Sequence, residues 1–105
     1  MEHETGINRI EIQAMRESAI ERPVCTFAKD HGVLAMKLAG PGQRGQPDRM
    51  FLKDGRVLFI EFKAPGKKPT PLQYWWSRRL AKHGMTWYWA DSYEEAVELI
   101  KKHLL

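Results

Sequence analysis

Residues 47–63 read PDRMFLKDGRVLFIEFK, and this segment decides the fold. Two runs in which apolar residues alternate, 48–53 and 56–63, flank the dipeptide Asp54-Gly55. Asp-Gly between such runs is a strong hairpin signal, because both residues of a type I′ turn need a positive φ. The segment therefore predicts two antiparallel strands joined by a two-residue turn.

The two-residue turn also fixes which residues face each other across the hairpin. With Lys53 opposite Arg56, the register continues to Asp48 opposite Glu61, and Lys63 projects from the same face as Glu61. Directly opposed like charges destabilise a strand pair, whereas two carboxylates suit a hard cation such as Mg²⁺. The hairpin thus predicts a metal site, unless Asp48 only caps the strand and Glu61 pairs with Lys63 in solvent.

The rest of the sequence predicts further helices and strands on both sides of the hairpin. In chain order we expect a helix (15–31), a strand (33–38), the two hairpin strands, a helix (70–84, caps included), a strand (86–90) and a final amphipathic helix that ends near 104. Pro23 should kink or interrupt the first helix, because it lacks an N–H. The order predicts an α/β fold, a mixed sheet flanked by helices, with residues 1–14 as a polar lead-in and 15–105 as one domain.

The charge of the chain is concentrated in its middle. The formal net charge of the 105 residues is +4, but residues 37–82 hold eleven cations against three acids and carry +8. Such a segment suggests an acidic partner. The single cysteine excludes an internal disulfide, and no apolar run approaches the roughly 18–20 residues of a membrane span. We expect a cytoplasmic protein with no membrane partner and no organic cofactor.

Several of these residues together resemble the VRR-NUC family, a branch of the PD-(D/E)XK or restriction-endonuclease-like nucleases. Pro47-Asp48, followed after twelve residues by Glu61-Phe62-Lys63, matches the PD-(D/E)XK pattern. The family's wider pattern is matched by ESAIE at 17–21, GPGQRGQPDR at 40–49, LFIEFKAPG at 58–66 and PLQ at 71–73. The resemblance runs from about residue 15 to 104. It implies the αβββαβ core of the restriction-endonuclease-like fold. The resemblance is compatible with a bacterial or a phage-encoded protein, and the sequence does not separate a cellular from a viral origin.

The resemblance implies roles for the residues of the hairpin. Asp48, Glu61 and the backbone carbonyl of Phe62 would bind Mg²⁺ or Mn²⁺. Lys63 would orient the attacking water or help to deprotonate it. The implied reaction is metal-dependent hydrolysis of a phosphodiester bond.

Residues outside the hairpin would complete the catalytic site. Gln73 matches a glutamine that the family places beside the catalytic centre, although it also fits a capping box with Thr70. The family also has an acidic residue on the first helix, and both Glu17 and Glu21 fit because they border the apolar face of that helix. The sequence does not separate these two glutamates, and Pro23 between them and the rest of the helix could rotate them apart.

Two basic loops flank the carboxylates, with Arg44 and Arg49 in one and Lys67 and Lys68 in the other. Around a phosphodiester site these cations would neutralise backbone phosphates. The resemblance implies a DNA endonuclease that acts on branched DNA, as Holliday-junction resolvases do. Because one chain has one site, cutting two strands symmetrically predicts a homodimer. The alternatives are a catalytically silent DNA-binding module on the same fold and an interaction protein with exposed tryptophans.

Overall fold

The computed structural model describes residues 8–38 and 45–105. Its elements, in chain order, are α2 (Arg9–Asp30), β1 (Leu34–Lys37), β2 (Arg49–Lys53), β3 (Arg56–Phe62), α3 (Pro71–Lys82), β4 (Thr86–Ala90) and α4 (Tyr93–Leu104). This order confirms the predicted succession of helices and strands. In the described ranges, no helix has the length and apolar character needed to cross a membrane.

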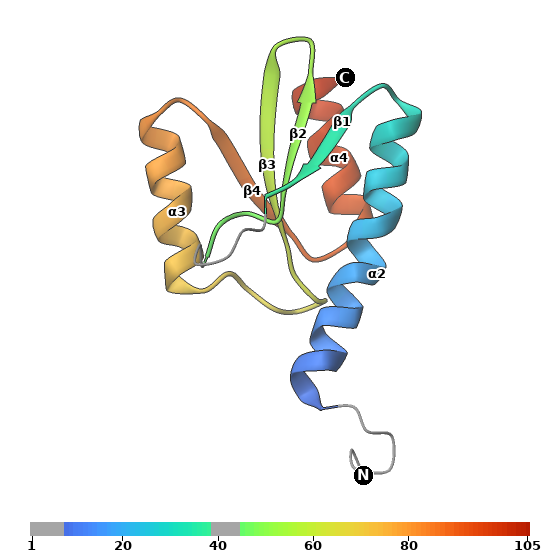
Figure 1. Ribbon diagram of the computed structural model, residues 1–105, viewed down its shortest axis with the longest axis vertical. Helices are drawn as coiled ribbons and strands as arrows, with labels where there is room; N and C mark the ends of the chain where they lie inside the picture. Colours follow the sequence, from blue (N-terminus) through green and yellow to red (C-terminus); the bar gives the residue numbers. More distant parts are fainter. Residues whose placement is uncertain (1–7, 39–44) are drawn as a thin grey trace.

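The four strands form one mixed sheet in the order β1-β2-β3-β4. The β1–β2 and β2–β3 pairs are antiparallel, and β3–β4 is parallel. The sheet lies between α3 on one side and α2 with α4 on the other (Figure 1). The core lies on the α2 and α4 side, where its largest members are Phe51, Leu58, Ile60, Phe62 and Ile100. The structure thus has the predicted α/β architecture.

The hairpin has the turn and the register that the sequence predicts. Asp54 and Gly55 have φ angles of 52° and 78°. Lys53 pairs with Arg56, and the ladder continues in the predicted register as far as Arg49 opposite Ile60. Asp48 lies just before β2, so its side chain lies at the end of the strand pair that is opposite the Asp54-Gly55 turn.

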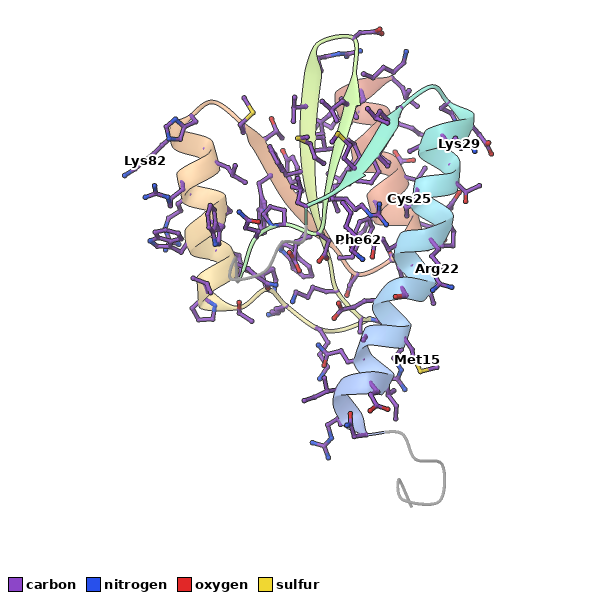
Figure 2. All side chains as sticks on the ribbon, viewed as in Figure 1. Met15, Arg22, Cys25, Lys29, Phe62 and Lys82 are labelled. Carbon is purple, nitrogen blue, oxygen red and sulfur yellow. The ribbon has the colours of Figure 1, made fainter. Side chains whose placement is uncertain are left out.

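The first helix is longer than predicted and is not interrupted. α2 begins at Arg9, six residues before the expected start, because the side chain of Asn8 accepts a hydrogen bond from the Glu11 N–H and caps it. α2 also continues through Pro23, which lies on the exposed face of the helix. The first turns extend beyond the sheet, and Met15 on this part is 60% exposed (Figure 2).

The helix α3 begins and ends where the sequence predicts, but it packs more loosely than expected. Thr70 is its N-cap, Pro71 occupies its first turn, and Gly84 follows its end with a φ of 76°. The expected inward stripe includes Leu72, which is 44% exposed, and no residue of α3 is fully buried. The reason is that α3 covers the sheet mainly beside β4, so its apolar side chains meet only a narrow strip of strand.

Candidate active site

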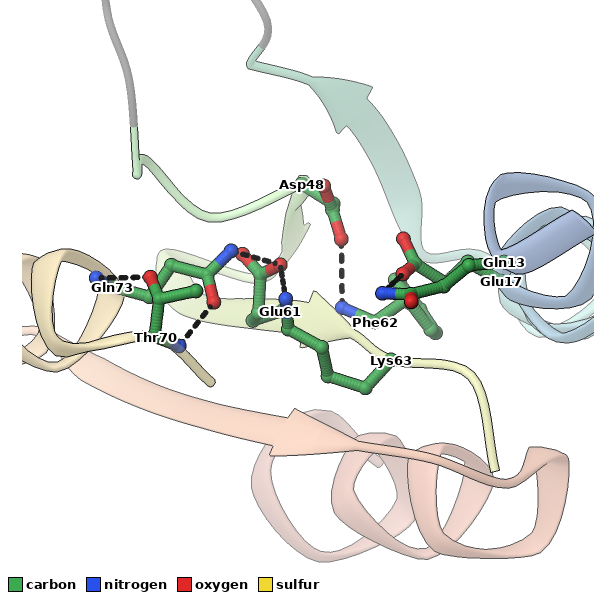
Figure 3. Close-up of polar contacts among 8 residues, drawn as sticks. All are labelled: Gln13, Glu17, Asp48, Glu61, Phe62, Lys63, Thr70 and Gln73. Atoms are coloured by element: carbon green, nitrogen blue, oxygen red, sulfur yellow. Dashed lines mark hydrogen bonds and ion pairs between the residues drawn. The ribbon is translucent and has the colours of Figure 1, made fainter. Parts of the chain in front are cut away.

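The end of the hairpin places Asp48 against the last residue of β3. Oδ2 of Asp48 accepts a 2.8 Å hydrogen bond from the backbone N–H of Phe62 (Figure 3). This bond holds the carboxyl group beyond the last ladder pair, next to the side chain of Glu61. The structure thus brings the two predicted carboxylates together.

Glu61 is the best-buried acid among the described residues, with 2% of its surface exposed. Its Oε2 accepts a 2.8 Å hydrogen bond from Nε2 of Gln73 and lies 3.6 Å from Nζ of Lys63. Lys63 is itself buried. Glu61, Lys63 and Gln73 therefore form one polar cluster at the end of β3, as Figure 3 shows.

Gln73 serves two purposes at once. Its Oε1 accepts a 2.8 Å hydrogen bond from the Thr70 N–H, and its backbone N–H donates to the Thr70 hydroxyl. This is the capping box that the sequence allows. The other end of the same amide contacts Glu61, so the capping box and a contact with the carboxyl pair are present together.

Both carboxyl groups of the pair have raised pKa values. Burial, and then the charge of Asp48, raises the pKa of Glu61 to about 9, although Lys63 opposes the shift. Burial also raises the pKa of Asp48, and the bond from the Phe62 N–H opposes this. Neighbouring carboxyl groups whose pKa values are both raised by burial are common at functional sites.

The two glutamates of α2 have different surroundings. Glu21 forms an ion pair with Nε of Arg49, whereas Glu17 accepts a 3.3 Å hydrogen bond from Nε2 of Gln13. The charges of Glu21 and Glu17 both raise the pKa of Asp48, and the charge of Glu17 also raises the pKa of Glu61. Of the two glutamates, Glu17 is therefore the one whose carboxylate is not occupied by a cation.

The cations predicted to bind DNA divide into two groups. Lys67 and Lys68 are exposed on the loop between β3 and α3. Arg49 is only partly exposed, and Glu21 occupies its guanidinium group. Strand alternation explains this, because consecutive residues point to opposite faces and Arg49 follows Asp48. Arg44 lies outside the described residues.

The donor set suits a hard divalent cation. Asp48 and Glu61 offer carboxylate oxygens only, and Mg²⁺ is commonly bound by one or two carboxylates with water and phosphate oxygens. Oε1 of Glu61 is buried without a hydrogen-bond partner. A buried oxygen of this kind is costly unless a proton or a cation satisfies it. Within residues 8–38 and 45–105, no group of three or more His, Cys, Asp or Glu residues is arranged to hold a metal by itself.

Comparison with known proteins identifies the family. No protein-family model matches the sequence. The chain is 43% identical over 63 residues to "Putative nuclease p44" of Acyrthosiphon pisum secondary endosymbiont phage 1. The aligned segment covers 59% of this chain and 68% of that protein. A solved structure described as a "VRR_NUC domain" aligns with a TM-score of 0.73 and 27% identity, over 82% of this chain and 95% of that structure. This chain therefore belongs to the VRR-NUC family of restriction-endonuclease-like nucleases.

Proposed function

We propose that this protein is a Mg²⁺- or Mn²⁺-dependent DNA endonuclease that hydrolyses phosphodiester bonds. The observation that carries the proposal is the cluster of half-buried Asp48 with the buried Glu61 and Lys63 at the end of the hairpin. A protein that only bound DNA would gain affinity by losing two acids from its most basic segment. The membership of a nuclease family supports the same conclusion.

In the proposed reaction, each residue of the cluster has a role that follows from its position. Asp48 and Glu61, with the backbone carbonyl of Phe62, would hold the cation. When bound, the cation neutralises charge on the phosphoryl group and makes water a better nucleophile. Lys63 would orient the attacking water and stabilise the negative charge that develops on the phosphoryl oxygens. Glu17, which faces the carboxyl pair from α2, would complete the site.

The contacts of Gln73 give it a positioning role in this reaction. Its amide nitrogen fixes Oε2 of Glu61, which leaves Oε1 for another partner. The capping box in turn fixes the amide relative to the start of α3. Gln73 would therefore set the orientation of the Glu61 carboxylate before DNA binds.

We further propose that the substrate is branched DNA and that the active form is a homodimer. The exposed Lys67 and Lys68 beside the site would contact phosphates whatever the base sequence. Stand-alone members of the family resemble Holliday-junction resolvases, which supports a branched substrate. One site per chain supports a two-fold symmetric pair, because two strands must be cut.

A cleavage assay on four-way, flapped and linear DNA tests this proposal. Wild-type protein should cut in the presence of Mg²⁺ or Mn²⁺, with the four-way junction cut fastest, and EDTA should abolish cutting. Asp48→Ala and Lys63→Ala should lower the rate by at least about 100-fold. Unchanged cleavage by these variants would contradict the mechanism. Binding of DNA without any cleavage by the wild type would favour the catalytically silent module instead.

A further inference from the structure

The helix α3 has a basic face that the carboxyl cluster does not use. Residues 62–90 contain no aspartate or glutamate, and three of their cations lie on this helix, namely Arg78, Arg79 and Lys82. All three are exposed, and none of them belongs to an ion pair within the described part of the chain. This face therefore carries a positive charge that an anionic partner would neutralise.

Two apolar side chains lie on the same face of α3 as the three cations. At about 100° per residue, Leu72 and Trp75 fall with the cations into one arc of about 120°. Leu72 is 44% exposed and Trp75 is 42% exposed. Gln73, which contacts Glu61, projects from nearly the opposite side of the helix. The outer face of α3, formed by these five residues, thus combines positive charge with an exposed indole ring.

Neighbouring side chains hold the ring of Trp75 in place. Cζ of Arg79 lies over the ring, 4.7 Å from its centroid. The ring of Trp76 meets it edge-on, with the two centroids 5.3 Å apart. Both are favourable contacts for an aromatic ring, and together they restrict the rotamers of Trp75. The indole is therefore ordered in advance, which lowers the entropy cost of stacking a ligand on it.

The outer face of α3 begins beside the candidate active site. Gln73 holds Glu61 from the inner side of the first turn. Leu72 packs against Gly45, three residues before Asp48, so closely that an added Cβ on Gly45 would lie 2.5 Å from Cγ of Leu72. The helix diameter of about 10 Å corresponds to about three nucleotides at roughly 3.4 Å each. A strand whose phosphate lies at the two carboxyl groups would therefore reach the outer face within a few nucleotides.

The chemistry of the outer face favours one kind of partner. A two-fold pair of chains formed through this face would set the three cations of one copy against the same three of the other. A continuous DNA duplex would satisfy the cations, but its bases cover one another and leave no free ring face. A branch interrupts the stack, so that bases beside it expose a ring face while their strand supplies phosphates. Aromatic rings in a basic groove are typical of surfaces that bind such bases.

We propose that the outer face of α3 binds the unstacked nucleotides of branched DNA, with one base stacked on Trp75. This inference rests on the proposed function and names the feature of the substrate that the protein recognises. The base would occupy the ring face that Arg79 does not cover. Arg78, Arg79 and Lys82 would contact the phosphates of the same strand. The stack would select DNA with a free base face a few nucleotides from the scissile phosphate.

Anisotropy titrations in EDTA with two flapped duplexes test the stack without cleavage. One flap is a short run of dT, and the other has the same phosphates with abasic sites in place of the bases. The wild type should bind the dT flap at least about fivefold more tightly, as expected for one stacked base. Trp75→Ala should bind both flaps with the affinity that the wild type has for the abasic flap. Trp75→Phe should keep part of the difference, since a phenyl ring still stacks.

Matched variants separate stacking from charge. Tyr93→Ala removes a ring of similar exposure, 37%, from α4 on the other side of the sheet (Figure 1), and should leave the preference for the dT flap unchanged. Arg78→Ala should weaken binding of both flaps equally and lower the slope of log affinity against log salt by up to about 1. The dT flap should also quench the indole emission of the wild type more than that of Trp75→Phe.

The outcomes are distinct from those that test the nuclease proposal. Asp48→Ala should lose cleavage and still prefer the dT flap as the wild type does. Equal binding of the two flaps by the wild type, or a Trp75→Ala variant that keeps the preference, would overturn the stacking proposal whatever the cleavage results. A changed oligomeric state of Trp75→Ala in sedimentation velocity would also overturn it, because the outer face would then be an interface between copies.

Discussion

Nε2 of Gln73 donates a 2.8 Å hydrogen bond to Oε2 of Glu61. The same amide accepts the N–H of Thr70, the N-cap of α3. A helix cap and a buried carboxylate therefore share one side chain, and the start of α3 fixes the orientation of Glu61. The contact also explains why a helix with no fully buried residue is held at this end of the sheet.

Replacement of Gln73 should separate its two roles when it is compared with replacement of Thr70. Gln73→Ala and Thr70→Ala both remove capping hydrogen bonds and should each cost about 1 kcal/mol of unfolding free energy. Only Gln73→Ala leaves Glu61 without its donor, so only this variant should lose about 10- to 100-fold in cleavage rate or metal affinity. Urea unfolding and single-turnover cleavage measure the two effects. Equal cleavage by both variants would show that Gln73 is only a cap.

Replacement of the two glutamates of α2, Glu17 and Glu21, should have different effects on metal affinity and on stability. Glu17→Gln removes a charge that faces the carboxyl pair and should lower metal affinity by about tenfold or more, with little change in stability. Glu21→Gln leaves Arg49 partly buried without its anion and should cost about 1–3 kcal/mol of stability. Isothermal titration with Mn²⁺ and thermal unfolding distinguish them. If Glu21→Gln had the larger effect on Mn²⁺ affinity, the assignment of Glu17 would be wrong.

The sequence predicts the features that depend on residues close together in the chain, namely the turn, the register of the hairpin and the cap of α3. The Asp54-Gly55 turn determines the register of the hairpin, and the register brings Asp48 and Glu61 to one end of the strand pair. The Thr70 cap is equally local. These features depend on contacts between residues close in sequence, where spacing alone decides which side chains can meet.

Contacts between distant elements were not predictable in the same way. The Arg49–Glu21 ion pair joins β2 to α2, and it depends on the angle at which the helix crosses the sheet. The alternation of β2 could have shown that Arg49 points away from Asp48, but not that Glu21 would meet it. The choice between Glu17 and Glu21 likewise needed the position of the whole helix. The early start of α2 has a signal in the sequence, because Asn8 followed three residues later by Glu11 fits a helix N-cap. Asparagine is also common in loops, so this signal does not by itself fix the start of the helix.

The ion pair leads to a prediction about the salt dependence of DNA binding. Each phosphate contact contributes about 0.9 to the slope of log affinity against log salt. Replacement of both Lys67 and Lys68 by alanine should therefore reduce the slope by up to about 2. Arg49→Ala should leave the slope unchanged and lower the stability instead, because its guanidinium group is bound to Glu21. Fluorescence anisotropy from 50 to 200 mM salt measures the slope, with Lys29→Ala as the control on α2. A loss of about 1 in the slope for Arg49→Ala would show that Arg49 contacts DNA.

The raised pKa of Glu61 predicts how the stability of the metal-free protein depends on pH. The pKa of about 9 means that the folded protein holds the Glu61 proton up to about pH 9, whereas the unfolded chain releases it near the ordinary glutamate pKa of 4.5. Between these values the folded state binds more protons, so the free energy of unfolding must fall as the pH rises, by up to about 1.4 kcal/mol per pH unit. Urea unfolding in EDTA at pH 5 to 9 measures this fall.

The variant Glu61→Gln is the control for this pH dependence, because it keeps the shape of the side chain and cannot ionise. Its unfolding free energy should vary less steeply with pH than that of the wild type, with only the smaller contribution of Asp48 remaining. Mg²⁺ should stabilise the wild type more at pH 8 than at pH 6, since binding must displace the proton from Glu61. It should have little effect on Glu61→Gln. A wild type whose stability is flat from pH 5 to 9, or a Mg²⁺ effect that is larger at pH 6, would contradict a protonated Glu61 at the centre of the site.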